Sequence, residues 1–325
     1  MINGKAFLYT LLLLVMLLAA CRPAQVEQGP FVQATATATP RSTPLPPVPT
    51  VVPPGTADNP IQMVINPDGV VTSAQISSFE EALREQSDLV INVSVVERYA
   101  EALAALCDSS PTNVTVAWLD GVTLEAALAQ NCGEPVMQVE RGTRNAQAGD
   151  AGLIIASEDA AFSGVEALDG RTFCRLALDD YYSWLVPSLM MRANGVDPVN
   201  DLESVVDYDS RNALIEAVIN GDCDATGISA QDFEALRDAQ QDALASIAET
   251  PPLPYAVLLY PLSLPLGERI RLEDALLVME NDTDASAALR PLLGQDSLSV
   301  VDDDAFEDVA DFLADTGLDF AQLSR

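Results

Sequence analysis

The chain has 325 residues, a formal net charge of −33, no histidine and a single lysine, Lys5, inside an apolar amino-terminal segment. This composition excludes a P-loop lysine, a Schiff-base lysine, Ser-His-Asp or Cys-His catalysis, and histidine-ligated zinc. The acidic excess argues against nucleic-acid binding, which needs a basic surface. We interpret the acidity as a solvated surface; the alternative is a field that steers cations toward the protein.

Residues 1–20 have the composition of a signal peptide. Lys5 precedes the apolar run Leu11–Leu18, which is short for a membrane span. Leu18-Ala19-Ala20-Cys21 matches the bacterial lipobox, whose cysteine is acylated and becomes the mature amino terminus. We therefore predict a protein anchored through Cys21 to the outer face of the bacterial cell membrane. The alternative is an ordinary signal peptide followed by a chance cysteine.

Residues 21–57 are rich in proline, threonine, alanine and valine and carry few charges. Such a segment cannot bury a core and prefers extended, polyproline-like conformations. We predict a stalk between the anchor and the folded part. The remainder, about 265 residues, is long enough for two lobes or one large domain.

From residue 58 onward, strand and helix patterns alternate. Apolar residues recur at helical spacing around Phe79, around Leu103 and over Leu124–Ala129. Repeated β-α-β units imply a mostly parallel sheet covered by helices on both faces. The strands predicted in this part are Ile61–Ile65, Leu89–Val96, Val114–Leu119, Pro135–Glu140 and Gly152–Ser157.

A second group of elements follows residue 162. We predict a strand at Thr172–Leu178, a polar loop at Asp179–Ser183, and a helix that has Pro187 near its first turn and ends at Gly195. A loop between the carboxyl end of a strand and the amino end of a helix is where open α/β sheets bind small ligands. This loop is therefore the first candidate for a binding site.

The chain then returns toward its first group of elements. A helix near Leu214 and a strand at Ala225–Ile228 precede three prolines, Pro251, Pro252 and Pro254. The buried strand expected at Tyr255–Tyr260 rejoins the first sheet, and the remaining residues are predicted to be helical and acidic. The acidic runs at Asp302–Asp304 and Asn281–Asp284 lack calcium-loop spacing, so a solvated acidic face is the better interpretation.

Several short sequences between residues 162 and 225 carry a family resemblance. Leu168-Asp-Gly-Arg-Thr-Phe173, a polar loop, Trp184-Leu-Val-Pro187 and Gly195-Val-Asp-Pro198 resemble the second lobe of phosphonate/phosphite-type solute-binding proteins of ABC transporters. Ser210-Arg211 and Asn220–Ala225 continue the resemblance. It implies the type II periplasmic-binding-protein fold, an α/β bilobal architecture in which two mostly parallel sheets are joined by two crossing strands.

The element order and the resemblance together predict the domain boundaries. We expect the crossing segments near Ser157 and near Pro254. The first lobe then comprises residues 58–158 and 252–325, where the second range holds the return strand and the carboxyl-terminal helices. The second lobe comprises residues 159–251.

Four cysteines remain beyond Cys21, which outside the cytoplasm indicates disulfides, and four cysteines allow three pairings. Cys107 and Cys132 each end a helix in consecutive β-α units, at the same edge of the first lobe. Cys174 and Cys223 lie in or beside strands of the second lobe. We therefore predict the pairs Cys107–Cys132 and Cys174–Cys223.

The predicted binding loop departs from the family pattern. Where these proteins present serines and a glycine to an anion, this chain has Asp179-Asp180-Tyr181-Tyr182-Ser183, which leaves Ser183 and the helix amino terminus as anion donors. Two carboxylates repel a phosphonate dianion, so we expect a neutral or cationic organic ligand with tyrosine walls. The predicted ligand-binding residues are Tyr99, Asp120, Asp179, Asp180, Tyr181, Tyr182, Ser183, Trp184, Ser210, Arg211 and Asp224.

Three of these assignments have structural alternatives. Asp179 or Asp180 can cap a helix start without touching a ligand, and the tyrosines can be surface aromatics. Arg211 can pair with Asp179 or Asp180, or it can be an exposed arginine at a helix start.

The function we expect is capture of a small molecule between two closing lobes and its delivery to an ABC permease, by a monomer that needs no cofactor or metal. A ligand sensor or a degenerate binder on the same fold is the second hypothesis. An extracytoplasmic enzyme is the third, but it would need Asp179 and Asp180 as its acid and base, and neighbours on one loop rarely flank a bond. We therefore do not expect an enzyme.

Overall fold

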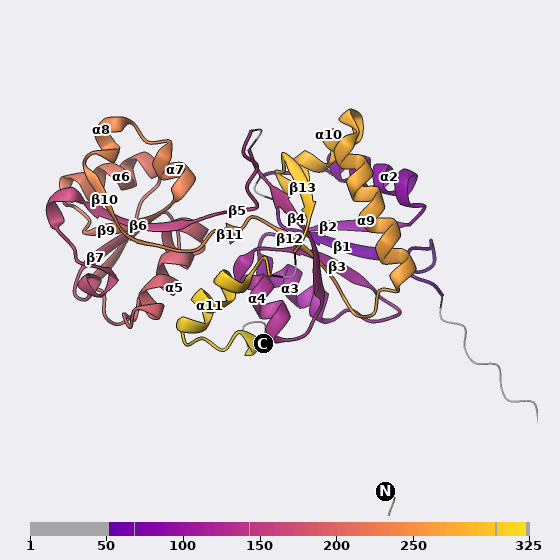
Figure 1. Cartoon of the computed structure of the whole chain (residues 1–325), viewed down its shortest axis with the longest axis horizontal. Helices are drawn as coiled ribbons and strands as arrows, with labels where there is room; N and C mark the ends of the chain where they lie inside the picture. Colours follow the sequence, from indigo (N-terminus) through magenta and orange to yellow (C-terminus); the bar gives the residue numbers. More distant parts are fainter. Residues whose placement is uncertain (1–51, 68, 143, 303, 323–325) are drawn as a thin grey trace, which may run out of the picture. The chain divides into compact units, whose positions relative to one another are not determined.

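The computed structural model describes residues 52–67, 69–142, 144–302 and 304–322. The predicted signal peptide, Cys21 and nearly all of the predicted stalk lie outside the described residues. Within them, two large sheets and a two-stranded ribbon form the framework (Figure 1). We call each large sheet, with the helices that cover it, a lobe.

The first sheet has the strand order β13-β4-β12-β3-β1-β2. β1 pairs in parallel with β2 and β3, whereas β12 and β13 are antiparallel to their neighbours. The parallel half contains the predicted β-α-β units. The strands of the whole first sheet are β1 (Ile61–Ile65), β2 (Ile91–Val95), β3 (Thr115–Leu119), β4 (Glu134–Glu140), β12 (Val257–Tyr260) and β13 (Ser297–Val300).

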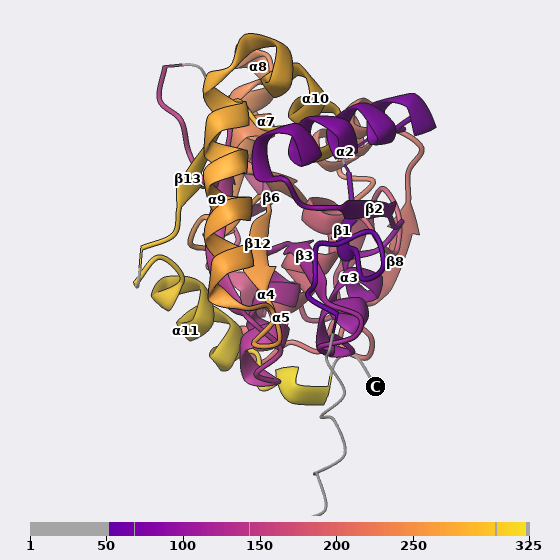
Figure 2. The ribbon, with the colours of Figure 1, turned by 90° about the vertical axis from the view of Figure 1, so that its right-hand side faces the viewer.

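Both faces of this sheet are buried, because alternate residues of its strands enter different core clusters. In β3, Val116 and Trp118 face one cluster, whereas Ala117 and Leu119 face the other. The first face is covered by α2 (Ser73–Ser87), α9 (Leu266–Asn281) and α10 (Thr283–Leu293), and Figure 2 shows α2 and α9 side by side. The other face is covered by α3 (Tyr99–Cys107) and α4 (Gly121–Ala129).

The second sheet has the order β10-β6-β9-β7-β8. β7 pairs in parallel with β8 and β9, and β6 is antiparallel to β9 and β10. Its strands are β6 (Gly152–Ser157), β7 (Thr172–Arg175), β8 (Ser204–Asp207), β9 (Ala225–Ser229) and β10 (Leu244–Glu249). Its helical segments are η1 (Glu158–Ala160), η2 (Val165–Leu168), η3 (Tyr181–Leu185), α5 (Val186–Ala193), α6 (Arg211–Asn220), α7 (Ala230–Glu234) and α8 (Asp238–Gln241).

The second sheet is also buried on both faces. Phe173 and Ile154 pack on the side of α5, whereas Cys174 and Ile155 pack on the side of α6. Two α/β sheets, each containing parallel pairs, confirm the predicted fold class.

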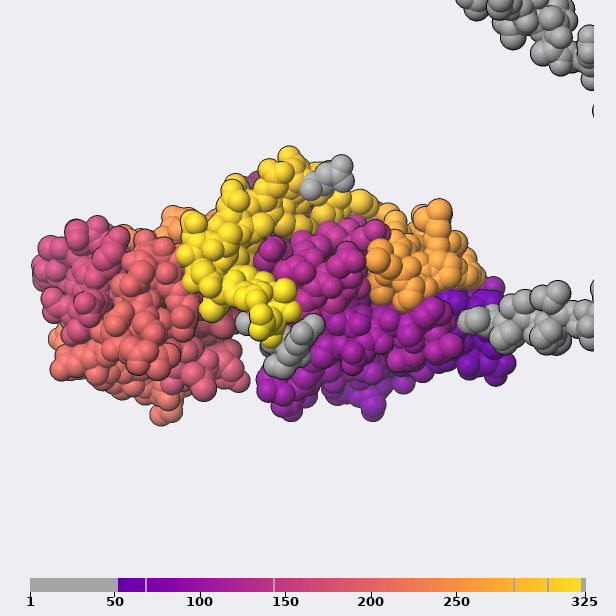
Figure 3. Space-filling model, turned by 90° about the horizontal axis from the view of Figure 1, so that it is seen from below, coloured from indigo at the N-terminus to yellow at the C-terminus, as the bar shows by residue number. Residues whose placement is uncertain are grey.

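Two crossing segments connect the lobes. β5 (Gly149–Asp150) and β11 (Leu253–Pro254) pair antiparallel, so the outgoing and returning chains form one narrow ribbon. The returning segment lies near Pro254, as expected, but the outgoing segment precedes Ser157, because β6 already pairs with β9 and β10 of the second sheet. The carboxyl-terminal helix α11 (Glu307–Asp315) contacts both α4 and α5, and η4 (Phe320–Gln322) packs on α4. Figure 3 shows this segment, in yellow, against both lobes.

Both predicted disulfides are present. Cys107–Cys132 joins the ends of consecutive helical units, with Cα atoms 4.7 Å apart. Cys174–Cys223 joins β7 to the segment before β9, with Cα atoms 5.9 Å apart. Neither bridge links one lobe to the other, so neither restrains a movement between them.

The structure differs from the sequence prediction mainly at the sheet edges. β8, β10 and β13 were not predicted as strands, and each lies at the end of its sheet. The segment after α10 is therefore not wholly helical. The predicted strand at Thr172–Leu178 ends at Arg175, and helical structure begins at Tyr181, inside the predicted loop.

Candidate functional site

The parallel strands of both lobes end at one cleft. Asn66 follows β1, Tyr99 begins α3 after β2, and Asp120 caps α4 directly after β3. From the second lobe, Asp179 follows β7 and precedes η3. These are the carboxyl ends of parallel strands, where open α/β sheets bind ligands.

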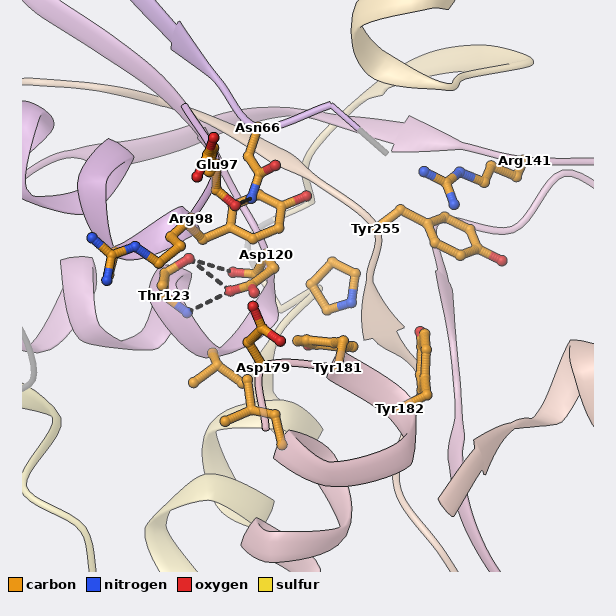
Figure 4. A pocket seen from close by; sticks show the side chains of 15 residues that line it. Asn66, Glu97, Arg98, Asp120, Thr123, Arg141, Asp179, Tyr181, Tyr182 and Tyr255 are labelled. Atoms are coloured by element: carbon orange, nitrogen blue, oxygen red, sulfur yellow. Dashed lines mark hydrogen bonds between the residues drawn. The ribbon is translucent and has the colours of Figure 1, made fainter. Parts of the chain in front are cut away.

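The cleft has a volume of about 480 Å³, and both lobes contribute to it (Figure 4). This volume is in the range of small-molecule sites. Its lining residues are Asn66, Glu97, Arg98, Tyr99, Ala100, Asp120, Val122, Thr123, Arg141, Asp179, Tyr181, Tyr182, Leu185, Pro254 and Tyr255.

Asp120 is a buried carboxylate, with 5% of its surface exposed. Its Oδ1 accepts hydrogen bonds from the backbone N–H of Thr123 at 2.8 Å and from the Thr123 hydroxyl at 2.6 Å, both drawn in Figure 4. Burial raises the pKa of this carboxyl, and the hydrogen bonds from Thr123 oppose the shift. No arginine forms an ion pair with Asp120 among the described residues.

The neighbouring acids Asp179 and Asp180 have different surroundings. Asp180 Oδ1 accepts a hydrogen bond of 2.7 Å from the backbone N–H of Ser183, so Asp180 caps η3. The carbonyl oxygen of Asp180 also accepts the N–H of Leu185 at 3.0 Å, which defines the π-helical turn. Asp179 is exposed, lines the cleft, and makes no hydrogen bond or ion pair within the described ranges.

Four tyrosines form much of the cleft wall. The rings of Tyr181 and Tyr182 meet edge to face, with centroids 5.0 Å apart. Burial raises the pKa of Tyr181 well above its ordinary value, and the negative charge of Asp120 adds to this shift. Burial also raises the pKa of Tyr182 and of Tyr255, and Asp150 contributes to both shifts. The phenols of Tyr181, Tyr182 and Tyr255 are therefore neutral at physiological pH.

The polar ends of these tyrosines differ. The hydroxyl of Tyr182 donates to the carbonyl oxygen of Asp150, in the crossing ribbon, at 3.4 Å. The hydroxyl of Tyr181 is buried and has no hydrogen-bond partner among the residues that the structure describes. An unpaired buried hydroxyl is costly unless a ligand or water satisfies it.

Two arginines also line the cleft. Arg98 donates to Glu101 through Nε at 2.9 Å and Nη2 at 2.6 Å. Arg141 lies with its guanidinium carbon 4.3 Å from the centroid of the Tyr255 ring. Figure 4 shows Arg98 pointing away from Asp120 and Asp179, and Arg141 beside Tyr255.

Five predicted site residues therefore meet in the cleft, namely Tyr99, Asp120, Asp179, Tyr181 and Tyr182. Six others do not line it. Asp180 caps η3, Ser183 Oγ accepts the backbone N–H of Leu176 at 3.0 Å, and Ser210 Oγ caps α6 by accepting the N–H of Ala213 at 3.3 Å.

The remaining three have partners within the second lobe. The ring centroids of Trp184 and Phe173 are 5.9 Å apart, and the guanidinium carbon of Arg175 lies 4.4 Å from the centroid of the Trp184 ring. Arg211 pairs with Asp232 at 2.7 Å, and not with Asp179 or Asp180. Asp224 accepts the backbone N–H of Thr172 at 2.8 Å.

The sequence interpretation missed several lining residues. Arg141 and Tyr255 come from segments that flank the crossing ribbon, and no local motif marks them. Asn66 and Glu97 could have been identified from the sequence, because they follow the predicted strands β1 and β2, and open α/β sheets bind ligands at such strand ends.

Neither a group of metal ligands nor a membrane-spanning helix is found in the part of the chain that the structure describes. No three cysteine, aspartate or glutamate side chains there are grouped as ligands of a metal ion. Asp282 caps α10, with its Oδ1 accepting the N–H of Asp284 at 3.0 Å and of Ala285 at 2.9 Å. Within the described ranges, no helix combines the length and apolarity needed to cross a bilayer.

Comparison with known proteins agrees with this fold and cleft. A family model described as the periplasmic substrate-binding protein of phosphonate ABC transporters matches residues 63–306. Because the match spans most of the sequence, the chain belongs to this family. Membership implies an extracytoplasmic location, a small-molecule ligand and a permease partner. No curated protein matches the sequence significantly.

Solved structures share the fold at low sequence identity. XAC2383 from Xanthomonas citri bound to chloride is 16% identical, with 79% of this chain and 96% of that chain covered and a TM-score of 0.59. The same protein bound to ATP is 15% identical, with the same coverage and a TM-score of 0.56. PA3383 from Pseudomonas aeruginosa, a binding protein component of an ABC phosphonate transporter, is 18% identical, with 80% and 87% covered and a TM-score of 0.52.

Proposed function

We propose that this protein captures a small organic solute in the cleft between its lobes and delivers it to an ABC permease. The observation that carries the proposal is the origin of the cleft lining: Tyr99 and Asp120 come from the first lobe, and Asp179 and Tyr181 come from the second. A ligand that touches both lobes stabilises the closed form over the open one. The ribbon of β5 and β11 is the hinge.

The protein acts at the membrane surface as a monomer. We propose that Cys21 is acylated and that residues 21–57 are the stalk. We also propose that the lobes divide at the ribbon of β5 and β11, which places the first boundary before β6 and not after residue 158. The role is binding rather than catalysis, because the sequence has no histidine and Asp180 is committed to a helix cap.

The proposal is tested by ligand-induced stabilisation of the full-length chain purified in detergent. The small-molecule fraction of an extract of the source cells is added, and thermal denaturation is followed. A ligand at a hundredfold excess over its dissociation constant stabilises the folded state by about 2.7 kcal/mol. Bound compounds are then identified by native mass spectrometry.

A matched pair of variants locates the binding. Ala100 is exposed and lines the cleft, whereas Ala287 is exposed on α10 and does not. Ala100→Trp fills the cleft and should abolish the stabilisation, whereas Ala287→Trp should retain it. Stabilisation that survives in both variants, or no binding to the wild-type protein, would contradict solute capture in this cleft.

A further inference from the structure

Two carboxylates from different lobes lie in the same cleft without a cationic partner among the described residues. Asp120 is buried at the end of β3, and its Oδ1 accepts two hydrogen bonds from Thr123. Asp179 is exposed and makes no hydrogen bond or ion pair in the described part of the chain. In Figure 4 the carboxylate of Asp179 points toward that of Asp120.

The arginines of the cleft do not neutralise this pair. The Arg98 guanidinium is within hydrogen-bonding distance of Glu101, and Arg141 stacks on Tyr255. A buried carboxylate without a paired cation is energetically costly, and a second carboxylate nearby adds repulsion. The cleft is therefore organised for a positive charge between Asp120 and Asp179.

The tyrosines that wall the cleft also favour a positively charged ligand. Tyr181 and Tyr182 present neutral rings, set edge to face at 5.0 Å, and Tyr99 lines the first-lobe side. Aromatic faces attract ammonium groups, and this attraction is strongest where water is excluded. The hydroxyl of Tyr181, buried and without a hydrogen-bond partner within the described ranges, supplies an independent polar group for a ligand.

We propose that the ligand carries a protonated amine or quaternary ammonium group, held between Asp120 and Asp179 and walled by Tyr99, Tyr181 and Tyr182. This inference rests on the proposed solute capture and names the ligand class of that cleft. A dianion placed there would be repelled by two carboxylates, and the stabilisation of an anion by one helix amino terminus is too weak to offset this repulsion.

The same arrangement couples ligand charge to closure. Each carboxylate belongs to one lobe, so closing the empty cleft brings two negative charges together and is disfavoured. A cation between them replaces this repulsion with attraction to both lobes. The ligand's charge is thus the source of its differential affinity for the closed form.

The experiment uses the full-length chain in detergent and three probes: choline, putrescine and methylphosphonate. Calorimetry gives the dissociation constants for wild type and for three variants. We expect an amine to bind the wild-type protein in preference to methylphosphonate. Asp120→Asn should weaken that binding about ten- to hundredfold, the range for charge-assisted hydrogen bonds. Asp179→Asn should weaken it about two- to fivefold, because solvent screens an exposed charge.

The control is Asp169→Asn, which removes the same charge from an exposed position of the second lobe outside the cleft. It should change the amine affinity less than twofold. Far-ultraviolet circular dichroism checks that each variant is folded, and asparagine keeps the helix cap that Asp120 provides.

The outcomes separate this inference from the proposed function. Tight binding of methylphosphonate with no binding of either amine overturns the inference but leaves solute capture intact. Equal amine affinity in wild type and Asp120→Asn also overturns it. A compound that the wild-type protein captures from the cell extract supports the inference if it contains a basic or quaternary nitrogen, and overturns it otherwise. If the wild-type protein binds none of the three probes and no component of the extract, the proposed function itself is wrong.

Discussion

The carboxylate of Asp180 accepts the backbone N–H of Ser183 at 2.7 Å, and this hydrogen bond fixes the start of the helical segment that forms one wall of the cleft. Asp179, one residue earlier, is left outside the helix and lines the cleft. Two adjacent acids therefore have different roles: Asp180 accepts a backbone hydrogen bond at a helix start, and Asp179 lines the cleft.

The cap predicts a difference in stability between substitutions at these two positions. Asp180→Ala should lower the free energy of unfolding by about 1 kcal/mol, whereas Asp180→Asn should be close to neutral because asparagine also caps helices. Asp179→Ala should leave it unchanged, since Asp179 makes no hydrogen bond within the described ranges. Urea denaturation measures all three, and equal losses for Asp179→Ala and Asp180→Ala would refute the assignment of the cap.

The two disulfides close loops of different length. In the chain-entropy relation, a separation of 25 residues for Cys107–Cys132 corresponds to about 3.5 kcal/mol, and 49 residues for Cys174–Cys223 to about 4 kcal/mol. We therefore expect the double Cys→Ala variant of Cys174–Cys223 to lose more stability than that of Cys107–Cys132. Denaturation by guanidinium chloride measures both losses. A larger loss for the Cys107–Cys132 variant would mean that local packing, rather than loop closure, decides the cost.

Asp120 predicts a pH-dependent stability difference. Burial raises the pKa of this carboxyl above its unfolded value, so its contribution is most favourable below the unfolded pKa and is lost as the pH rises through the folded pKa. Asp120→Asn removes the buried charge and keeps the cap. The variant should be more stable than wild type at pH 7, and the difference should shrink as the pH falls.

Thermal denaturation between acidic and neutral pH checks this difference. Asp169→Asn, at an exposed position, serves as the control for losing one formal charge. A stability gain from Asp120→Asn that is the same at every pH would show that burial of the charge is not its cause.

Close packing beneath η3 predicts opposite effects for two glycine substitutions. A Cβ at Gly227 would collide with the carbonyl oxygen of Tyr182 and with Pro187, whereas a Cβ at Gly267, on α9, would meet nothing within 4 Å. Gly227→Ala should cost about 1–3 kcal/mol through overpacking. Gly267→Ala should stabilise the helix by about 0.5–1 kcal/mol. Urea denaturation distinguishes them, and a neutral Gly227→Ala would show that η3 can shift.

Cys21 predicts the route of membrane attachment. Cys21→Ser removes the acylated residue of the lipobox Leu18-Ala19-Ala20-Cys21 and should release the protein from membranes without changing the melting temperature of the folded part. Cell fractionation with immunodetection measures the release, and Thr43→Ser, in the predicted stalk, is a control that leaves the lipobox intact. Full membrane retention of Cys21→Ser would argue against lipid anchoring.

The sequence alone determined the elements that are stabilised locally or are fully buried. β1, β3 and β6 are nearly continuous apolar runs, because strands buried on both faces leave no room for alternation. The order of these strands and helices also placed the four cysteines near their partners. The fold class and both disulfide pairs followed from these features.

The tertiary structure decided the sheet edges. β8, β10 and β13 have half-exposed, partly polar sequences such as Ser204–Asp207, and each is an outermost strand of its sheet. An edge strand pairs on one side only and carries weak apolar periodicity. Its hydrogen bonds come from a neighbour that is distant in the chain, so no local pattern reveals it.

The tertiary structure also decided which polar residues face the cleft. Asp179 and Asp180 are equivalent in the sequence, and only the position of the first helical turn decides which carboxylate caps η3 and which lines the cleft. Arg141 and Tyr255 reach the cleft because β5 and β11 pair, although more than a hundred residues separate the two. A cleft between lobes is assembled by contacts across the whole chain, whereas apolar periodicity reports only which face of one element is buried.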